Sequence, residues 1–332
     1  MGSPLGAVAP TGRPPDQPSV TWAVLRILLI VNSFASSVTA RNTVIVQREL
    51  ARHHDVQVVE TNRRGHATRF AQDAANRRVD VVIGFGGDGT LNEVATGIAG
   101  TDAALGVLPG GSTNVFARTL GMPNDPVAAA RMLATALDDP TSIRPIGLGR
   151  VNGRYFCFHT GIGYDAAVVR AVEKRASVKR WMGHPLFIYA ATSTWLHGYD
   201  RANPHFSLRF PDGHEVPDGY FTIVLNTNPY TYLGNRPLDL SPAATLDRGL
   251  VVLTFRTMKV TSILGSLAGA LRGGGVKPSA HLDERTDVTG FEVSSERPFP
   301  YQLDGDYLGE TSHLAFTHEP DAVQLVMPAA PR

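Results

Sequence analysis

The stretch 79–97, VDVVIGFGGDGTLNEVATG, decides the fold of the surrounding chain. It begins with an apolar run, Val81 to Ile83, continues through a glycine-rich turn and ends in a pattern typical of a helix. Thr90 and Glu93 have the spacing of a capping box, which predicts that the helix begins at the loop. A strand, a glycine turn and a helix N-terminus form a cradle for phosphate, because backbone N–H groups point outward and the helix dipole favours an anion.

The same loop carries an acid. Gly86, Gly87 and Gly89 leave no side chain to obstruct a ligand, whereas Asp88 would repel a phosphate group. The acid is compatible with phosphate when a metal ion lies between the two negative charges, or when the carboxylate takes part in proton transfer. The loop therefore predicts a nucleotide that binds together with Mg²⁺.

Two common phosphate loops fit this stretch poorly. Gly84, Gly86 and Gly89 satisfy G-x-G-x-x-G, but the dinucleotide fingerprint also needs an acid about 20 residues later. The next expected strand, Leu105–Leu108, leads into Pro109-Gly110-Gly111 instead. A Walker A loop needs a Lys–Ser/Thr pair, and none follows Gly89.

Three motifs resemble those of the diacylglycerol kinase catalytic-domain family. GGDGTLNE at 86–93 is similar to the signature GGDGT-x-NE, LPGGSTNVFA at 108–117 to P-x-G-[ST]-x-N, and QLDGD at 302–306 to Q-x-D-G-[DE]. They occur in the family's order, over about residues 26–328. NAD kinases and phosphofructokinases share the GGDG core but usually lack the Asn-Glu that follows. The resemblance implies a lipid kinase that uses ATP with Mg²⁺.

Composition restricts the partners and the compartment. The chain has 332 residues, a net charge of +1 and a single cysteine, Cys157. This charge gives no electrostatic argument for nucleic acid, and one cysteine fits a reducing, cytoplasmic compartment. Residues 1–21 carry five prolines and predict a disordered extension. The apolar run Leu25–Val31 is too short to span a bilayer, so we expect any membrane association to be peripheral.

Alternating strand and helix patterns predict an α/β fold with two domains. The first, 24–142, reads as a Rossmann-like domain with a parallel sheet, similar to phosphofructokinases and NAD kinases. Residues 143–321 read as an antiparallel, β-rich sandwich domain that binds the lipid, with one long helical stretch at 166–196. The resemblance implies that the last strand, 322–328, returns to the first domain.

Ligands of such sheets bind at the carboxyl ends of the strands. The expected nucleotide contacts follow four strands and comprise Asn32, Thr61, Gly86, Gly87, Asp88, Gly89, Thr90, Asn92, Glu93, Ser112, Thr113 and Asn114. Several have an alternative role: Glu93 in the capping box, and Thr61 and the residues 112–114 as helix caps. Two positions depart from the family pattern, Ser33 in place of a proline and Val115 in place of an aspartate.

A lipid hydroxyl needs a proton acceptor within hydrogen-bond reach before it attacks phosphorus. Asp304 is the expected base, on an Asp-Gly turn that could equally be an ordinary hairpin turn. Asp306 occupies the final acidic position of the motif and can share or own this role. Asp88 remains a third candidate.

Further expectations concern metal and membrane. Some bacterial relatives hold a structural Mg²⁺ near an Asp-Gly pair, and here Asp247 is the available acid, since Arg248 replaces the expected aspartate. The basic run Lys174–Trp181, with aromatic residues nearby, could touch an anionic membrane or form a solvated helix face. A homodimer is compatible with the sequence.

The sequence thus predicts a peripheral, ATP-dependent lipid kinase that converts diacylglycerol to phosphatidic acid. A sphingoid base or another lipid alcohol is the alternative acceptor, and NAD is disfavoured by the residues after GGDG. A non-catalytic protein that binds nucleotide or lipid is the alternative of a different class.

Overall fold

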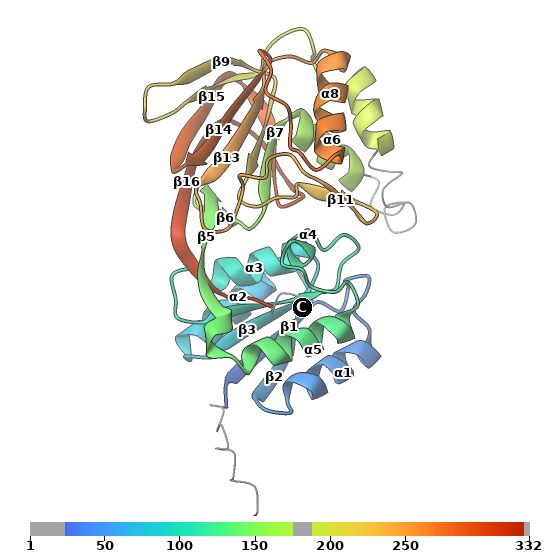
Figure 1. Ribbon diagram of the computed structural model, residues 1–332, viewed down its shortest axis with the longest axis vertical. Helices are drawn as coiled ribbons and strands as arrows, with labels where there is room; N and C mark the ends of the chain where they lie inside the picture. The colour runs from blue at the N-terminus through green and yellow to red at the C-terminus, as the bar shows by residue number, and fades with distance from the viewer. Residues whose placement is uncertain (1–23, 175–187, 329–332) are drawn as a thin grey trace, which may run out of the picture.

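The computed structural model describes residues 24–174 and 188–328 and has two lobes stacked along its long axis (Figure 1). The N-terminal lobe combines a parallel sheet with helices, and the C-terminal lobe is rich in antiparallel strands. These two parts confirm the predicted fold class. The extension expected at 1–21 lies outside the described residues.

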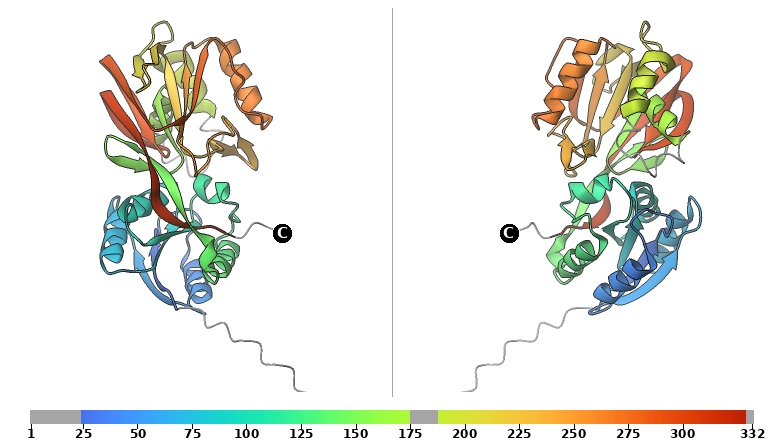
Figure 2. Two further views of the ribbon diagram at one scale, coloured as in Figure 1. Left: turned by 60° about the vertical axis from the view of Figure 1, so that its left-hand side comes forward. Right: turned by 90° about the vertical axis from the view of Figure 1, so that its right-hand side faces the viewer.

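The N-terminal lobe is built on four parallel strands in the order β2-β1-β3-β4. Every residue of β3 and β4 is buried, as expected for central strands covered on both faces. Helices α1 and α5 pack together on one face of the sheet, and α2 and α3 pack together on the other (Figures 1 and 2). The elements are β1 (Arg26–Val31), α1 (Ala40–Leu50), β2 (Asp55–Glu60), α2 (His66–Asn76), β3 (Val81–Gly86), α3 (Asp88–Ile98), β4 (Ala104–Pro109), α4 (Val115–Thr119), α5 (Pro126–Leu137) and the 3₁₀ turn η1 (Pro140–Ser142).

Two long strands join the lobes. β5 (Ile143–Val151) leaves the N-terminal lobe, and β16 (Asp306–Val326) runs back into it, antiparallel to β5. The end of β16 pairs in parallel with β4, where Gln324 lies opposite Ala104. The chain therefore does return to its first sheet, and one sheet of 14 strands runs through both lobes.

The C-terminal lobe contains the antiparallel order β14-β13-β10-β7-β15-β16. Its further elements are β6 (Arg154–Phe156), β7 (His159–Gly163), α6 (Tyr164–Glu173), a π-helical turn η2 (Thr194–Gly198), β8 (Phe206–Arg209), β9 (Glu215–Gly219), β10 (Phe221–Leu225), β11 (Thr231–Leu233), β12 (Arg236–Leu238), β13 (Leu250–Phe255), α8 (Val260–Leu271), β14 (Leu282–Val288) and β15 (Gly290–Leu303).

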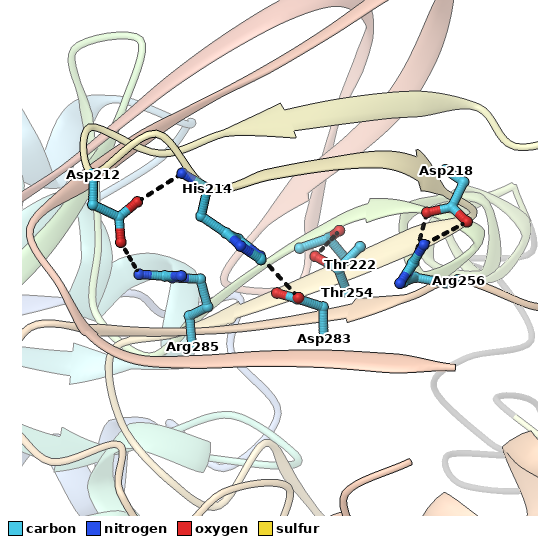
Figure 3. Close-up of polar contacts among 8 residues, drawn as sticks. All are labelled: Asp212, His214, Asp218, Thr222, Thr254, Arg256, Asp283 and Arg285. Atoms are coloured by element: carbon cyan, nitrogen blue, oxygen red, sulfur yellow. Dashed lines mark hydrogen bonds and ion pairs between the residues drawn. The ribbon is translucent and has the colours of Figure 1, made fainter. Parts of the chain in front are cut away.

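Polar pairs fix neighbouring strands of this lobe against one another (Figure 3). Arg256 donates two hydrogen bonds to Asp218, of 2.6 and 3.0 Å, and the hydroxyl groups of Thr222 and Thr254 lie 3.0 Å apart. His214 contacts Asp283 across 2.9 Å. These pairs link β9 and the turn before it to the end of β13 and to β14, and they link β10 to β13.

The structure corrects several predicted boundaries in this lobe. α6 ends at Glu173, and helical structure resumes at residues 188–198, so 166–196 is not described as one helix. α8 was not predicted, because its sequence VTSILGSLAGAL contains none of the charged residues that mark the outer face of a surface helix. β15 and β16 are long strands of 14 and 21 residues, and β16 contains the predicted return strand up to Val326.

Candidate active site

A cleft of about 550 Å³ lies at the carboxyl ends of the parallel strands, where the two lobes meet. All of its lining residues but one belong to the N-terminal lobe, and the exception is Asp306. The lining comprises Asn32, Phe34, Ala35, Ser36, Thr61, Asn62, Arg63, Arg64, Ala67, Gly87, Gly89, Thr90, Glu93, Gly111, Ser112 and Asp306. The cleft therefore lies at the sheet edge that the sequence indicated.

Two glycine loops form the base of the cleft. The loops after β3 and β4 touch through their backbones, since a Cβ atom on Gly111 would lie only 2.8 Å from the Cα atom of Gly87. A Cβ atom on Gly110 would lie equally close to the Cα atom of Gly86. α3 begins directly after Gly87, so its first N–H groups have no partner within the helix. This backbone surface can hold a phosphate group.

Asp88 turns away from the cleft. Its carboxylate accepts hydrogen bonds of 3.0 Å from the backbone N–H groups of Val115 and Phe116, at the start of α4. Burial raises the pKa of Asp88, and these hydrogen bonds oppose the rise. The acid has a structural partner in the N-terminus of α4, so its presence in the loop no longer requires a metal ion. Asp88 therefore gives no argument for Mg²⁺, and Mg²⁺ binding stays a prediction.

The predicted capping box is also wrong. Glu93 accepts hydrogen bonds from the backbone N–H groups of Gly65 (2.8 Å) and Ala67 (3.0 Å), which belong to the start of α2 rather than α3. The Thr90 hydroxyl accepts a hydrogen bond of 2.9 Å from Asn32. Both side chains join neighbouring loops of the cleft, and α3 begins three residues earlier than expected.

Asn92 and Asp304 connect the two lobes. Asn92, on α3, donates hydrogen bonds to the Asp304 carboxylate (2.8 Å) and to the carbonyl of Tyr155 (2.9 Å). The same carboxylate accepts from three consecutive backbone N–H groups, those of Cys157, Phe158 and His159, at 2.7 to 3.0 Å. Burial raises the pKa of Asp304 to about 7 against these four donors. A pKa near 7 suits a base, but both oxygen atoms are already occupied and the residue is only 6% exposed.

Asp306 lies two residues further along the same turn and faces the cleft. Its side chain is 44% exposed, and its Oδ2 atom lies 3.4 Å from the position that a Cβ atom would take on Gly89. Its Oδ1 atom lies 3.3 Å from a guanidinium nitrogen of Arg64. Of the three predicted carboxylates, Asp306 alone lines the cleft.

Residues 61–64 illustrate what sequence reasoning found and missed. Thr61 lines the cleft as predicted, and the polar residues that follow it, Asn62, Arg63 and Arg64, line it as well. Two adjacent arginines after the end of a parallel strand could have marked a phosphate contact. Phe34, which is largely exposed, also lines the cleft and was not predicted.

The second predicted loop is divided between cleft and interior. Ser112 lines the cleft, but Asn114 is fully buried. The side chain of Asn114 accepts from the Gly111 N–H (2.7 Å) and donates to the Gly111 carbonyl (2.9 Å), which closes the loop on itself. Thr113 and Asn92 are likewise not among the residues that line the cleft.

Asp247 lies exposed on a loop of the C-terminal lobe. Hydrogen bonding to Thr245 lowers its pKa. Among residues 24–174 and 188–328, no group of three or more His, Cys, Asp or Glu side chains is arranged to hold a metal ion. The structure thus gives Asp247 no partners for the predicted metal site.

A phosphate cradle that faces a carboxylate from a second lobe has the parts of a phosphotransferase. Comparison with known proteins defines this class further. Residues 26–146 match the model of the diacylglycerol kinase catalytic domain. "Probable lipid kinase YegS-like" of Chromohalobacter salexigens is 30% identical over 302 residues, which cover 89% of each chain. The protein of the same name from Pseudomonas aeruginosa is 30% identical and covers 92% of this chain and 95% of its own.

Two further matches agree. The diacylglycerol kinase of Bacillus subtilis is 40% identical over 131 residues, which are 35% of this chain and 42% of that protein. A crystal structure of a diacylglycerol kinase from Bacillus anthracis shares the fold, with a TM-score of 0.68, 22% identity and coverage of 92% and 98%. The chain therefore belongs to the diacylglycerol kinase catalytic-domain family and is a lipid kinase of this family.

Proposed function

We propose that this chain transfers the γ-phosphoryl group of ATP to the hydroxyl group of diacylglycerol, which gives phosphatidic acid. The observation that carries the proposal is the position of Asp306 against Gly89, because it brings a carboxylate from one lobe to the phosphate loop of the other. The similarity to diacylglycerol kinases supports the choice of acceptor.

The N-terminal lobe binds the nucleotide in this proposal. The phosphate groups lie on the backbone of the loops 86–90 and 110–112, where the glycines permit close approach and the start of α3 favours negative charge. Arg64 and Arg63 add positive charge at the rim of the cleft. Mg²⁺ enters as part of the substrate, ATP·Mg²⁺, with phosphate oxygens among its ligands.

Asp306 is the general base in this proposal. Asp304 and Asp88 use their carboxylate oxygens in hydrogen bonds to backbone N–H groups, whereas Asp306 meets the cleft. Asp304 then positions Asp306, because it fixes the turn on which both lie. Asn92 has the same supporting role, since it holds Asp304 from the opposite lobe.

The reaction follows from this placement. The hydroxyl oxygen of the lipid attacks the γ-phosphorus atom, and its proton moves to the Asp306 carboxylate. The bond between the γ-phosphorus and the bridging oxygen breaks, and ADP leaves with that oxygen. Positioning and charge stabilisation supply most of the rate enhancement in such transfers. The lipid reaches the cleft from a membrane surface on which the protein is peripherally bound at the cytoplasmic side.

Transfer of label from radiolabelled ATP to a panel of acceptors tests the proposal. The panel holds diacylglycerol, monoacylglycerol, ceramide, sphingosine and undecaprenol in mixed micelles, with NAD in parallel. We expect label in phosphatidic acid, a loss of at least about 100-fold with Asp306→Asn, and unchanged activity with Asp247→Asn. The second substitution is a matched control, because Asp247 is an exposed aspartate outside the cleft.

Each alternative has its own result. Label in a different acceptor would replace diacylglycerol while leaving the phosphotransferase mechanism in place. Bound ATP without transfer to any acceptor would contradict the enzymatic function and favour a binding protein. Full activity of Asp306→Asn would remove Asp306 from the role of base.

A further inference from the structure

Helix α8 carries an apolar stripe on its outer surface. Val260, Leu264, Leu267 and Leu271 follow one another at helical spacing and are between 38% and 57% exposed. The helix contains no charged residue over its 12 positions. Solvent-facing helices ordinarily place polar residues at such positions, as α2 does with Arg69, Gln72 and Asp73. A stripe of this kind on a chain with few other exposed apolar side chains points to a binding surface.

A second apolar element faces α8 across a groove. In the right-hand view of Figure 2, α8 and the helical segment 188–198 flank the strands of the sheet, on the same face. Ile188, Tyr189 and Leu196 of this segment are each more than half exposed. The groove between the two elements, about 160 Å³, is lined by apolar residues that include Phe221, Phe255 and Leu267. The exposed stripe thus continues into an apolar hollow.

Acidic residues are absent from the sequence of these two elements. Residues 188–199 and 257–282 contain no Asp or Glu. The acids that follow them already have partners, since Asp200 accepts hydrogen bonds from residues 202 and 203 and Asp283 contacts His214. Lys259 and Arg272 lie at the two ends of α8, and Lys277 follows; all three are exposed and form no ion pair with any described residue. Asp239 lies close to Gly273, just after α8, and it accepts a hydrogen bond from Asn228.

We propose that the face formed by α8 and residues 188–198 docks on an anionic lipid bilayer. The apolar side chains of both elements enter the boundary between headgroups and acyl chains, and the cations at the ends of α8 meet anionic headgroups. Tyr189 and Trp195 suit this boundary, because one end of each aromatic side chain is apolar and the other is polar. The choice of a bilayer as the occupant rests on the proposed function, while cations around an apolar stripe support it independently.

This face is linked to the candidate active site. At the floor of the groove, Asp165 accepts a hydrogen bond of 2.8 Å from the Gln302 side chain and another from the Tyr230 hydroxyl. Gln302 in turn accepts a hydrogen bond of 2.8 Å from the N–H of Gly305, next to Asp306. A bilayer on this face therefore lies next to the groove. Hydrogen bonds at the floor of this groove hold the turn that carries the proposed base, Asp306.

Cosedimentation with vesicles tests the docking face without any turnover. The probes are vesicles of phosphatidylcholine alone and vesicles that also contain phosphatidylglycerol, both without nucleotide or diacylglycerol. We expect binding to the anionic vesicles that weakens at least tenfold in the double variant Leu264→Ser/Leu271→Ser. Lys259→Gln/Arg272→Gln should reduce the preference for anionic vesicles severalfold. Val44→Ser is the matched control, because Val44 is equally exposed but lies on α1 of the other lobe.

The remaining outcomes overturn the inference. Equal vesicle binding by wild type and the Leu264/Leu271 variant would do so, and so would binding that ignores lipid charge. A concentration-dependent dimer in sedimentation velocity that the Leu264/Leu271 variant dissociates would assign the face to a second copy of the chain. Thermal unfolding of each variant is measured alongside, and an unchanged midpoint shows that lost binding is not lost folding.

The assay separates this inference from the proposed function. Vesicle binding without phosphorylation of any acceptor leaves the docking face in place and removes the kinase proposal. Phosphorylation of a short-chain diacylglycerol dispersed as monomers, without vesicle binding, would support the kinase proposal and remove the docking face.

Discussion

The cleft between the lobes and the groove beside α8 are lined by different kinds of residues. The cleft is lined by backbone, glycines and polar side chains, including Gly87, Gly111 and Arg64. The groove is lined mainly by aromatic and aliphatic side chains, with Asp165 and Tyr230 as its polar floor. The shape of the cleft depends on glycines, which have no side chain to fill it, whereas the shape of the groove depends on the packing of large apolar side chains. Substitutions should therefore harm the two regions in different ways.

The turn at residues 302–306 is the point where the two regions meet. Gln302 points to the groove network and Asp306 to the cleft, while Asp304 holds the turn between them. Asp304 and Gly305 both have positive φ angles, +47° and +84°, as a two-residue hairpin turn of Asp-Gly requires. One short turn thus joins the groove to the cleft, and its rigidity should matter to both regions.

The largest effect on stability is expected for Asp304→Asn. An asparagine offers one acceptor oxygen to four N–H donors, so its own NH₂ group would face at least one pair of buried donors. Leaving two such donors without an acceptor costs about 3 kcal/mol. Urea unfolding monitored by circular dichroism measures the loss. A variant as stable as the wild type would show that Asp304 does not fix the lobes, and Asp306→Asn serves as the control that leaves these contacts intact.

A smaller change in stability is expected for glycine-to-alanine substitutions, and its sign should differ between the cleft and α8. In Gly111→Ala the new methyl group lies 2.8 Å from the Gly87 backbone, so the two loops must move apart. We expect a loss of about 1–3 kcal/mol in stability together with weaker nucleotide binding, measured by calorimetry. Gly265→Ala is the matched control, because nothing lies within 4 Å of its added methyl group. It should stabilise the protein by up to about 1 kcal/mol, since alanine favours a helix.

The difference between the regions also explains what the sequence could predict. The parallel strands and the glycine loops follow from local patterns. Asn32, Thr61 and Ser112 were predicted because each follows a predicted strand, and ligands of a parallel sheet bind at the carboxyl ends of its strands. The roles of Asp88 and Glu93 could not be predicted, because the backbone N–H groups that these side chains cap become adjacent to them only in the folded chain. Asn114 differs, since it closes its own loop by contacting Gly111, three residues earlier in the sequence.

The C-terminal lobe was harder to predict for a second physical reason. α8 carries no charged residue and exposes several of its apolar side chains, so the charged outer face that marks a surface helix is missing. The basic run predicted as a membrane contact lies, apart from Lys174, outside the described residues. The structure instead shows exposed apolar side chains on α8, whose sequence had no amphipathic pattern to reveal them.

At neutral pH the smallest effect is expected for a histidine beside the groove, because its contribution changes only on acidification. His159 is buried, and its ring packs 4.4 Å from the ring of Tyr230. Its Nδ1 atom has no hydrogen-bond partner among the described residues. Burial lowers the pKa of His159 from 6.5 to about 3, so the folded protein holds this ring neutral. The unfolded chain then binds more protons than the folded one between these two values, and the stability contributed by His159 is full above pH 6.5 and falls on acidification.

The variant His159→Phe keeps an aromatic ring at this position but cannot take up a proton. We expect the wild type to lose up to about 1.4 kcal/mol more than the variant for each pH unit between 6 and 4. Urea unfolding at half-unit steps of pH gives both slopes, and the difference between them isolates His159 from the acids that titrate in the same range. Parallel slopes would mean that the ring is protonated in the folded state. In that case the β7 side of the groove would hold a charge, and the contrast between a polar cleft and an apolar groove would fail at this residue.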